Sequence, residues 1–144
     1  MPTSHQNWTW QCDQVIPNDL IVGRQLLDDV LEQLRTLHWG THDIFGVHLA
    51  VDEALVNAIC HGNGHDETKR VRFTSHLSPD RVRVEISDEG AGFDPDSLPD
   101  PTAPNRIGCP GGRGVLLMRA FMSRVEFHDH GSRVVLEKDR DSLE

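Results

Sequence analysis

The hydrophobic and polar positions of the chain change period from segment to segment. Trp8, Trp10 and Cys12 alternate with polar residues, which predicts a first strand. Pro17-Asn18-Asp19 ends this strand and offers a cap for a helix. From Leu20 to Leu37, apolar residues follow the helical spacing and charged residues occupy the opposite face. This pattern predicts an amphipathic helix that packs on one side.

The next segment is apolar in almost every direction. Residues 44–59 are nearly all apolar, which predicts a helix buried on most of its sides. Thr41 or Asp43 is expected to cap its start, and Gly62-Asn63-Gly64 is expected to end it.

Three polar residues interrupt this apolar helix at a regular interval. Glu53, Asn57 and His61 recur at i, i+4 and i+8. In an α-helix this spacing places the three side chains in one line along one face. A buried helix has no structural need for such a row, so the row indicates a ligand.

A hairpin follows the two helices. Residues 70–77 and 81–86 alternate between apolar and polar positions on either side of a turn at 78–80, which predicts two antiparallel strands with one buried face. Asp88 continues the inward-facing positions of the second strand. A carboxylate at an inward position is costly unless a partner binds it.

Glycine and proline dominate residues 89–114, and a loop of this length is usually functional or disordered. Residues 115–122 then predict a short apolar helix, and residues 125–127 and 134–136 predict a last hairpin. The order of elements predicts an α+β fold. We expect one domain over residues 1–144, a two-layer α/β sandwich with helices on one face of a mostly antiparallel sheet.

Composition and net charge restrict the classes of function that the chain can have. The net charge of −9 disfavours a broad nucleic-acid surface, and fits either a basic protein partner or simple solubility. No apolar run approaches the roughly 20 residues of a membrane span, and the N-terminus does not have the pattern of a secretory signal. Cys12, Cys60 and Cys109 are odd in number and widely spaced. We therefore expect no disulfide framework, no zinc site and a reduced, cytoplasmic setting.

Three features together indicate a Mg-ATP site. Gly111-Gly112-Arg113-Gly114 opens a helix, where free backbone N–H groups bind phosphate. Asn57 offers an amide oxygen suited to Mg²⁺, and Glu53, one turn away, is a candidate general base. Asp88, followed by Gly90-Ala91-Gly92, can accept a hydrogen bond from an amino group such as that of adenine. The chain has neither a Walker A sequence nor the dinucleotide fingerprint.

Three motifs carry a resemblance to a known family: E53-A-L-V-N57-A-I-C-H61-G62, D88-E-G90-A-G92-F93 and G112-R-G114. In this order they resemble the N, G1 and G2 boxes of the GHKL (histidine kinase-like) ATPase superfamily, over about residues 8–140. From the 144 residues we expect none of the further domains of gyrase, MutL or a histidine kinase. It is similar to the free-standing anti-sigma factor serine/threonine kinases of the RsbW/SpoIIAB type.

The resemblance implies a role for each matching residue. It implies that Glu53 is the catalytic base, that Asn57 is the Mg²⁺ ligand and that Asp88 binds the adenine amino group. It implies an ATP lid over about residues 95–111. Ser132 stands where the family often has threonine, and its hydroxyl is expected near the base. The implied nucleotide-binding residues are Asn57, His61, Asp88, Gly90, Gly92, Phe93, Gly111, Gly112, Arg113, Gly114 and Ser132.

The resemblance also implies partners. Members of the family sequester a sigma factor and use ATP and Mg²⁺ to phosphorylate a STAS-domain anti-anti-sigma protein. It implies a homodimer, with Arg24 as a candidate for the partner surface, and from charge and hydropathy we expect neither nucleic acid nor a membrane as a partner. Two alternatives stay open: a nucleotide-binding regulator without kinase turnover that acts by occluding its partner, and a switch kinase that activates a phosphatase. The arginines of the 70–77 and 81–86 strands either balance nearby acids or line a homodimer contact.

Overall fold

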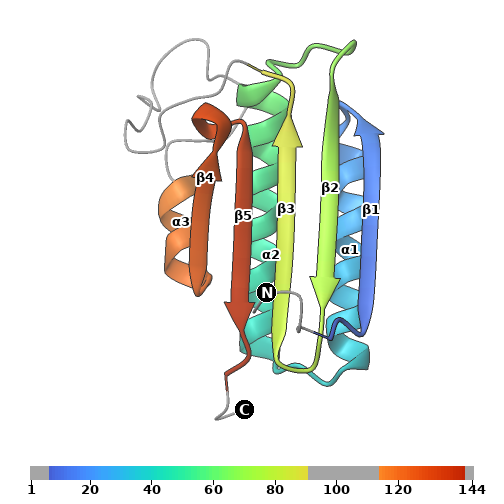
Figure 1. Ribbon diagram of the computed structural model, residues 1–144, viewed down its shortest axis with the longest axis vertical. Coiled ribbons are helices and arrows are strands. Elements are labelled where there is room, and N and C mark those ends of the chain that lie inside the picture. Colours follow the sequence, from blue (N-terminus) through green and yellow to red (C-terminus); the bar gives the residue numbers. More distant parts are fainter. Residues whose placement is uncertain (1–6, 91–113, 142–144) are drawn as a thin grey trace.

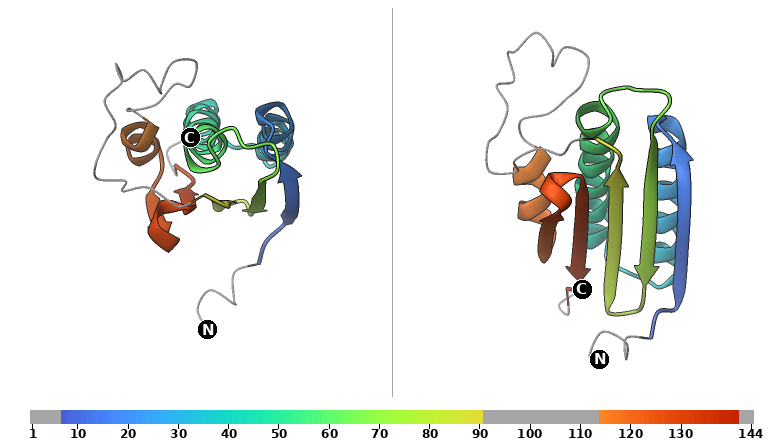
Figure 2. Two further views of the ribbon diagram at one scale, coloured as in Figure 1. Left: turned by 90° about the horizontal axis from the view of Figure 1, so that it is seen from above. Right: turned by 45° about the horizontal axis from the view of Figure 1, so that its top comes forward.

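The computed structural model describes residues 7–90 and 114–141. In these residues, helices pack on one face of an antiparallel sheet. Figure 1 shows the sheet in front and the helices behind it. Seen from above in Figure 2, the helices form one layer and the strands the other. The predicted α+β sandwich with helices on one face is therefore confirmed.

The elements follow the predicted order. They are β1 (Trp10–Pro17), α1 (Leu20–Thr36), α2 (Thr41–Val56), a π-helical turn (Asn57–Gly62), β2 (Arg70–Leu77), β3 (Arg81–Asp88), α3 (Gly114–Phe121), β4 (Arg124–His128), a 3₁₀ turn (Asp129–Gly131) and β5 (Arg133–Asp139).

The sheet runs in the order β1-β2-β3-β5-β4, and every neighbouring pair is antiparallel. The strand β3 lies in the centre, where Val71 of β2 is opposite Asp88 and Val134 of β5 is opposite Ile86. This register places the last residue of β3 between two strands, at the end of the sheet that is uppermost in Figure 1.

The core lies between the two layers. Because apolar residues recur on one face of each helix and on alternate positions of each strand, the layers bury them against each other. Each large side chain that is fully buried contributes about 1.5–3 kcal/mol by leaving water. The largest of them include Leu27, Leu34, Val47, Val51, Leu55, Phe73, Ile86, Met118 and Leu136. This packing fixes the end of α2 beside the end of β3.

The helix starts differ in chemistry. Asp19 caps α1 as predicted, and its Oδ1 accepts the N–H of Ile21 at 2.9 Å. Gly40 occupies the cap position of α2 without a side-chain bond, so the prediction of Thr41 or Asp43 as the cap is wrong. The reason is that Asp43 is fully buried and faces the end of the chain instead.

The carboxylate of Asp43 holds the C-terminal segment. Its Oδ2 accepts the N–H of Asp141 at 2.9 Å, and its Oδ1 lies 3.6 Å from Lys138 Nζ. A buried carboxylate that binds a backbone N–H and a cation ties the start of α2 to the end of β5.

The helix formed by α2 and the π turn, Thr41–Gly62, spans 22 residues and is long and apolar enough to cross a membrane by length and composition. The expectation that no apolar stretch approaches that length is therefore wrong for this helix. Half of its most apolar window is buried inside the fold, as in the core helix of a two-layer sandwich. Length and composition are thus weak evidence for a membrane span here.

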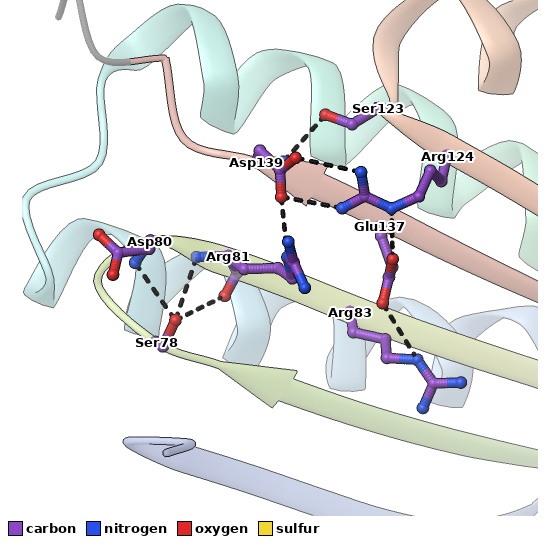
Figure 3. Close-up of polar contacts among 8 residues, drawn as sticks. All are labelled: Ser78, Asp80, Arg81, Arg83, Ser123, Arg124, Glu137 and Asp139. Atoms are coloured by element: carbon purple, nitrogen blue, oxygen red, sulfur yellow. Dashed lines mark hydrogen bonds and ion pairs between the residues drawn. The ribbon is translucent and has the colours of Figure 1, made fainter. Parts of the chain in front are cut away.

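The face of the sheet that points away from the helices is charged. Arg72 lies 2.6 Å from Asp13, and Arg81 lies 2.8 Å from Asp139. Arg124 contacts both Asp139 and Glu137, as Figure 3 shows. Arg72, Arg81 and Arg83 are therefore paired with acids, which is the first of the two roles considered for the arginines of these strands.

Candidate functional site

One pocket opens where β3 ends. As the described residues leave it, the pocket is narrow, with a cavity volume of about 10 Å³. The end of α2, the π turn, β3, α3 and the β4–β5 hairpin all contribute to it. Its lining residues are Ala54, Asn57, Ala58, Ile86, Asp88, Met118, Phe127, Gly131, Ser132 and Val134. Apolar walls with a few polar groups at the rim are typical of small-molecule sites.

The last residues of the predicted polar row lie in a π-helical turn, Asn57–Gly62. Within it, the N–H of Asn63 donates to Ala58 O at 2.8 Å, a separation of five residues. The helix therefore changes from α-helical to the wider π-helical spacing between Asn57 and His61. Asn57 lines the pocket and His61 is not among the lining residues. The nucleotide contact of His61 stays a prediction.

Asp88 lines the pocket as an inward carboxylate, as its position in the strand predicts. Its Oδ1 accepts the N–H of Gly90 at 2.8 Å, and its own N–H donates to Ser132 O at 2.8 Å. Burial raises the pKa of Asp88 to about 6, against the Gly90 N–H and the charge of Lys69, which both lower it. The carboxylate is thus short of partners for its charged form, as expected of a group that awaits a donor.

Two glycines let the backbone approach this carboxylate. A Cβ on Gly62 would lie 2.3 Å from Asp88 Oδ2, and a Cβ on Gly90 would lie 1.8 Å from Gly62 O. Real atoms do not approach so closely, so both positions require glycine. Because both residues are glycines, Gly62 at the end of the π turn and Gly90 after β3 can lie in direct contact.

Asn63 holds the contact between Gly62 and Gly90 in place through hydrogen bonds. This role of Asn63 was not predicted from the sequence. Its Oδ1 accepts the N–H of Glu89 at 2.8 Å, and its Nδ2 donates to Asn18 Oδ1 and Arg70 O, each at 3.0 Å. The residue is buried. In the sequence, Asn63 stands between two glycines and has the appearance of an ordinary turn residue, so no periodic signal marks it.

Glu53 and Asn57 face the start of α3. A Cβ on Gly114 would lie 3.0 Å from Glu53 Oε2 and 3.3 Å from Asn57 Nδ2. Gly114 therefore leaves room at a helix N-terminus for a carboxylate and an amide. Carboxylate and amide oxygens are ligands that Mg²⁺ takes, so Glu53 and Asn57 fit a Mg²⁺ site.

Ser132 lies on the pocket wall, although its hydroxyl is engaged elsewhere. Its Oγ donates to Asp129 O at 2.8 Å, and its carbonyl accepts the N–H of Asp88. A contact of this hydroxyl with a base stays a prediction. The predicted lid and the remaining box residues lie outside the described residues: Gly92, Phe93, Gly111, Gly112 and Arg113.

Cys60, in the π turn, corrects the expectation of reduced thiols throughout. It is disulfide-bonded, whereas Cys12 is free. The expectation failed because the separation of cysteines along a sequence says little about their distance in the fold.

Comparison with known proteins identifies the class that this fold and pocket define. The family model of the histidine kinase-like ATPase domain matches residues 16–138. The chain therefore belongs to the histidine kinase-like ATPase family, which confirms the resemblance of the three boxes.

Three proteins that are similar to this chain have names that describe an activity. Serine-protein kinase RsbW of Listeria innocua is 26% identical over 145 residues, covering 96% of this chain and 90% of the relative. Anti-sigma F factor of Clostridium beijerinckii is 32% identical over 101 residues, covering 67% and 71%. Serine/threonine-protein kinase BtrW of Bordetella bronchiseptica is 30% identical over 91 residues, covering 62% and 64%.

Proposed function

We propose that this chain is a Mg-ATP-dependent serine/threonine protein kinase that also acts as an anti-sigma factor. The observation that carries the proposal is Asp88, an under-bonded carboxylate with a raised pKa in the wall of a pocket. It lies beside Gly62 and Gly90 in a chain of an ATPase family.

Nucleotide recognition follows from the pocket wall. Asp88 is the acceptor for the exocyclic amino group of adenine. Ile86, Met118 and Phe127 supply apolar surface for the flat ring. A nucleobase with an amino group donates a hydrogen bond to the buried Asp88. A nucleobase without this group would leave the carboxylate buried and unpaired, so it should bind more weakly.

The catalytic residues lie toward the start of α3. Glu53 accepts the proton of a serine or threonine hydroxyl, whose oxygen forms a bond to the γ-phosphorus while the bond from this phosphorus to the bridging oxygen of ADP breaks. Asn57 would hold Mg²⁺, which neutralises charge on the phosphate oxygens when bound. Gly114 keeps the space between these side chains clear.

The sigma factor is proposed from the names of the relatives, and the STAS-domain antagonist and the homodimer are proposed from the resemblance of the three boxes. One relative is named anti-sigma F factor and others are named serine-protein kinases. We assign to this chain a sigma factor as the sequestered partner and a STAS-domain protein as the phosphorylated antagonist, in a cytoplasmic homodimer. Arg24, which is half-exposed on α1 and paired with Asp52 of α2 at 2.7 Å, is a candidate for the partner surface.

A nucleotide-dependent regulator without turnover is the second candidate. The hydroxyl of Ser132 donates its hydrogen bond to Asp129 O and not to a group in the pocket. This favours an altered contact between Ser132 and the base. In that case nucleotide would control only the occlusion of the partner. A switch kinase would share the chemistry and differ in the partner it activates.

Labelled ATP distinguishes these functions. The full chain is incubated with γ-labelled ATP, Mg²⁺ and a STAS-domain protein encoded in the same genome. Label on a serine or threonine of the STAS protein supports the kinase. A folded chain that binds ATP and transfers no label to any STAS protein of that genome supports the regulator. Capture of a phosphatase instead of a sigma factor identifies the switch kinase.

A further inference from the structure

The two helices on either side of α2 each expose a large apolar side chain near Glu53. Ile21, in the first turn of α1, is 69% exposed, and Leu116, in the first turn of α3, is 56% exposed. Seen from above in Figure 2, α2 lies between α1 and α3. We propose that Ile21 and Leu116 dock the protein that carries the acceptor hydroxyl, and that they select a serine or threonine flanked by apolar residues. This inference rests on the proposed function.

Ile21 is placed beside Glu53 by the contact between α1 and α2. It precedes Arg24 by one helical turn on the same face of α1. Arg24 Nε donates to Asp52 Oδ1 at 2.7 Å, and Asp52 directly precedes Glu53 in α2. The hydrogen bond with Asp52 raises the pKa of Arg24, and the negative charge of Glu53 raises it further. The surface that carries Ile21 and Arg24 therefore borders the proposed base.

Leu116 borders the same carboxylate from the other side. A Cβ on Gly114 would lie 3.0 Å from Glu53 Oε2. Leu116 follows Gly114 by about 3 Å along the axis of α3. Its side chain is exposed, whereas the adjacent Val115 is buried in the core. The proposed base thus lies between two exposed apolar side chains that come from different helices.

A protein substrate explains these two side chains, and the nucleotide does not. Neither Ile21 nor Leu116 is among the residues that line the pocket. A hydroxyl on a folded protein reaches the base only if the surface around that hydroxyl contacts the surface around Glu53, because transfer depends on close approach of the reacting atoms. Apolar side chains buried in such a contact supply affinity, while an exposed ion pair such as Arg24–Asp52 contributes mainly to orientation and specificity.

The experiment measures label transfer from γ-labelled Mg-ATP to the STAS-domain protein over a range of STAS concentrations. Ile21→Gln and Leu116→Gln remove the apolar contact with a residue that helices tolerate well. The KM for the STAS protein should rise about tenfold in each variant, as expected for the loss of one apolar contact. The kcat and the calorimetric affinity for Mg-ADP should stay within about twofold of wild type, because only binding of the acceptor is weakened.

Two control variants carry the same substitution at exposed apolar positions away from Glu53. Val15 on β1 is 59% exposed, and Phe45 near the start of α2 is 55% exposed. Phe45 precedes Glu53 by about 12 Å along the helix. Val15→Gln and Phe45→Gln should therefore transfer label with the KM of wild type.

The possible results separate this inference from the proposed function. An unchanged KM in both Ile21→Gln and Leu116→Gln overturns the inference and leaves the kinase in place. An equal rise in the control variants overturns it as well, as does a rise that comes with an equal loss of Mg-ADP affinity. Light scattering tests a second copy as the occupant: a wild-type dimer that dissociates in either variant assigns the surface to the dimer and overturns the inference. If wild type labels no STAS protein of the genome, the inference and the proposed kinase both fail.

Discussion

Polar side chains are paired with each other at one end of the sheet and face a pocket at the other. At the β2–β3 turn, Arg81 and Arg124 both contact Asp139, as seen in Figure 3. There Arg140 also donates to Leu37 O at 3.2 Å, and Trp39 Nε1 donates to Ser78 O at 3.3 Å. At the opposite end, β3 stops at a carboxylate between glycines.

The two ends of the sheet have different roles. One end stabilises the fold, and the other end forms the proposed binding pocket. At the paired end, the C-terminal strand is tied to the α1–α2 connection by bonds that need no ligand. At the pocket end, Gly62, Gly90 and Gly114 supply space in place of side-chain contacts. The burial of Asp88 raises its pKa, which is a cost that a bound donor removes. We expect changes at the first end to affect unfolding and changes at the second to affect nucleotide chemistry.

The largest effect is expected from Glu53→Gln. The amide keeps the size of the side chain and cannot accept the proton of the attacking hydroxyl. Label transfer to the STAS protein should fall about 10²–10⁴-fold, the usual contribution of a general base. Mg-ADP affinity, measured by calorimetry, should stay close to that of wild type. Transfer at the wild-type rate would remove Glu53 from the role of base.

Asn63→Ala tests whether the buried hydrogen bonds behind the pocket both stabilise the fold and hold Gly90 in place. It leaves the N–H of Glu89 and the carbonyl of Arg70 without their partner. The free energy of unfolding should fall by about 1–3 kcal/mol for a buried unsatisfied group. ADP affinity should fall as well, because Asn63 positions Gly90. Urea denaturation and calorimetry measure the two quantities, and an unchanged affinity would show that the pocket does not depend on this network.

The raised pKa of Asp88 predicts a pH dependence at the pocket end. Only the ionised carboxylate is a pure acceptor, so affinity should fall as pH decreases through about 6. At pH 5 about one molecule in ten retains the ionised form, so binding should weaken about tenfold. The unliganded protein should change in the opposite sense, since a carboxyl with a raised pKa in the folded state favours folding as pH falls from about 6 toward 3.8.

Adenosine is the ligand for this measurement, because it lacks phosphates that titrate in the same range. Ligand-observed NMR at pH 5 and pH 7 gives the two affinities. Asp88→Asn is the matched control and should show no pH dependence of whatever binding remains. Equal adenosine affinity of wild type at both pH values would contradict the assignment of Asp88 as the acceptor.

The smallest effect is expected from Arg124→Met at the paired end. Arg124 binds Glu137 and Asp139, and its side chain is 40% exposed. Solvent screens such a pair, so its loss should lower the free energy of unfolding by at most about 1 kcal/mol. The affinity for Mg-ADP should not change. A loss of affinity comparable to that of Asn63→Ala would show that the two ends are coupled.

Much of this fold could be predicted from periodicity. The alternation in β2 and β3 predicted both strands and the inward position of Asp88, because a strand has only two faces. The helical spacing predicted α1 and its cap Asp19. The cap of α2 was mispredicted, since Asp43 bonds to a residue 98 positions away and no local pattern reveals that contact.

The candidate site was predictable only in part. Glycines at close approaches leave a signal, and Gly90 and Gly114 were found through it. The π turn left none, because a helix with one wider turn has the same composition as an α-helix. For that reason the π turn and the network of Asn63 required the structure. The disulfide of Cys60 depends on distance in space, which the spacing along the chain does not give.

The central claim is that the pocket beside Asp88 binds the adenine nucleotide. Calorimetric titration of ATP, with and without Mg²⁺, into wild type and Asp88→Asn tests it most directly. We predict that wild type binds ATP, that Mg²⁺ strengthens the binding, and that Asp88→Asn loses it while its circular dichroism and unfolding midpoint stay near those of wild type. Absence of ATP binding by folded, reduced wild type, or wild-type affinity in Asp88→Asn, would contradict the account.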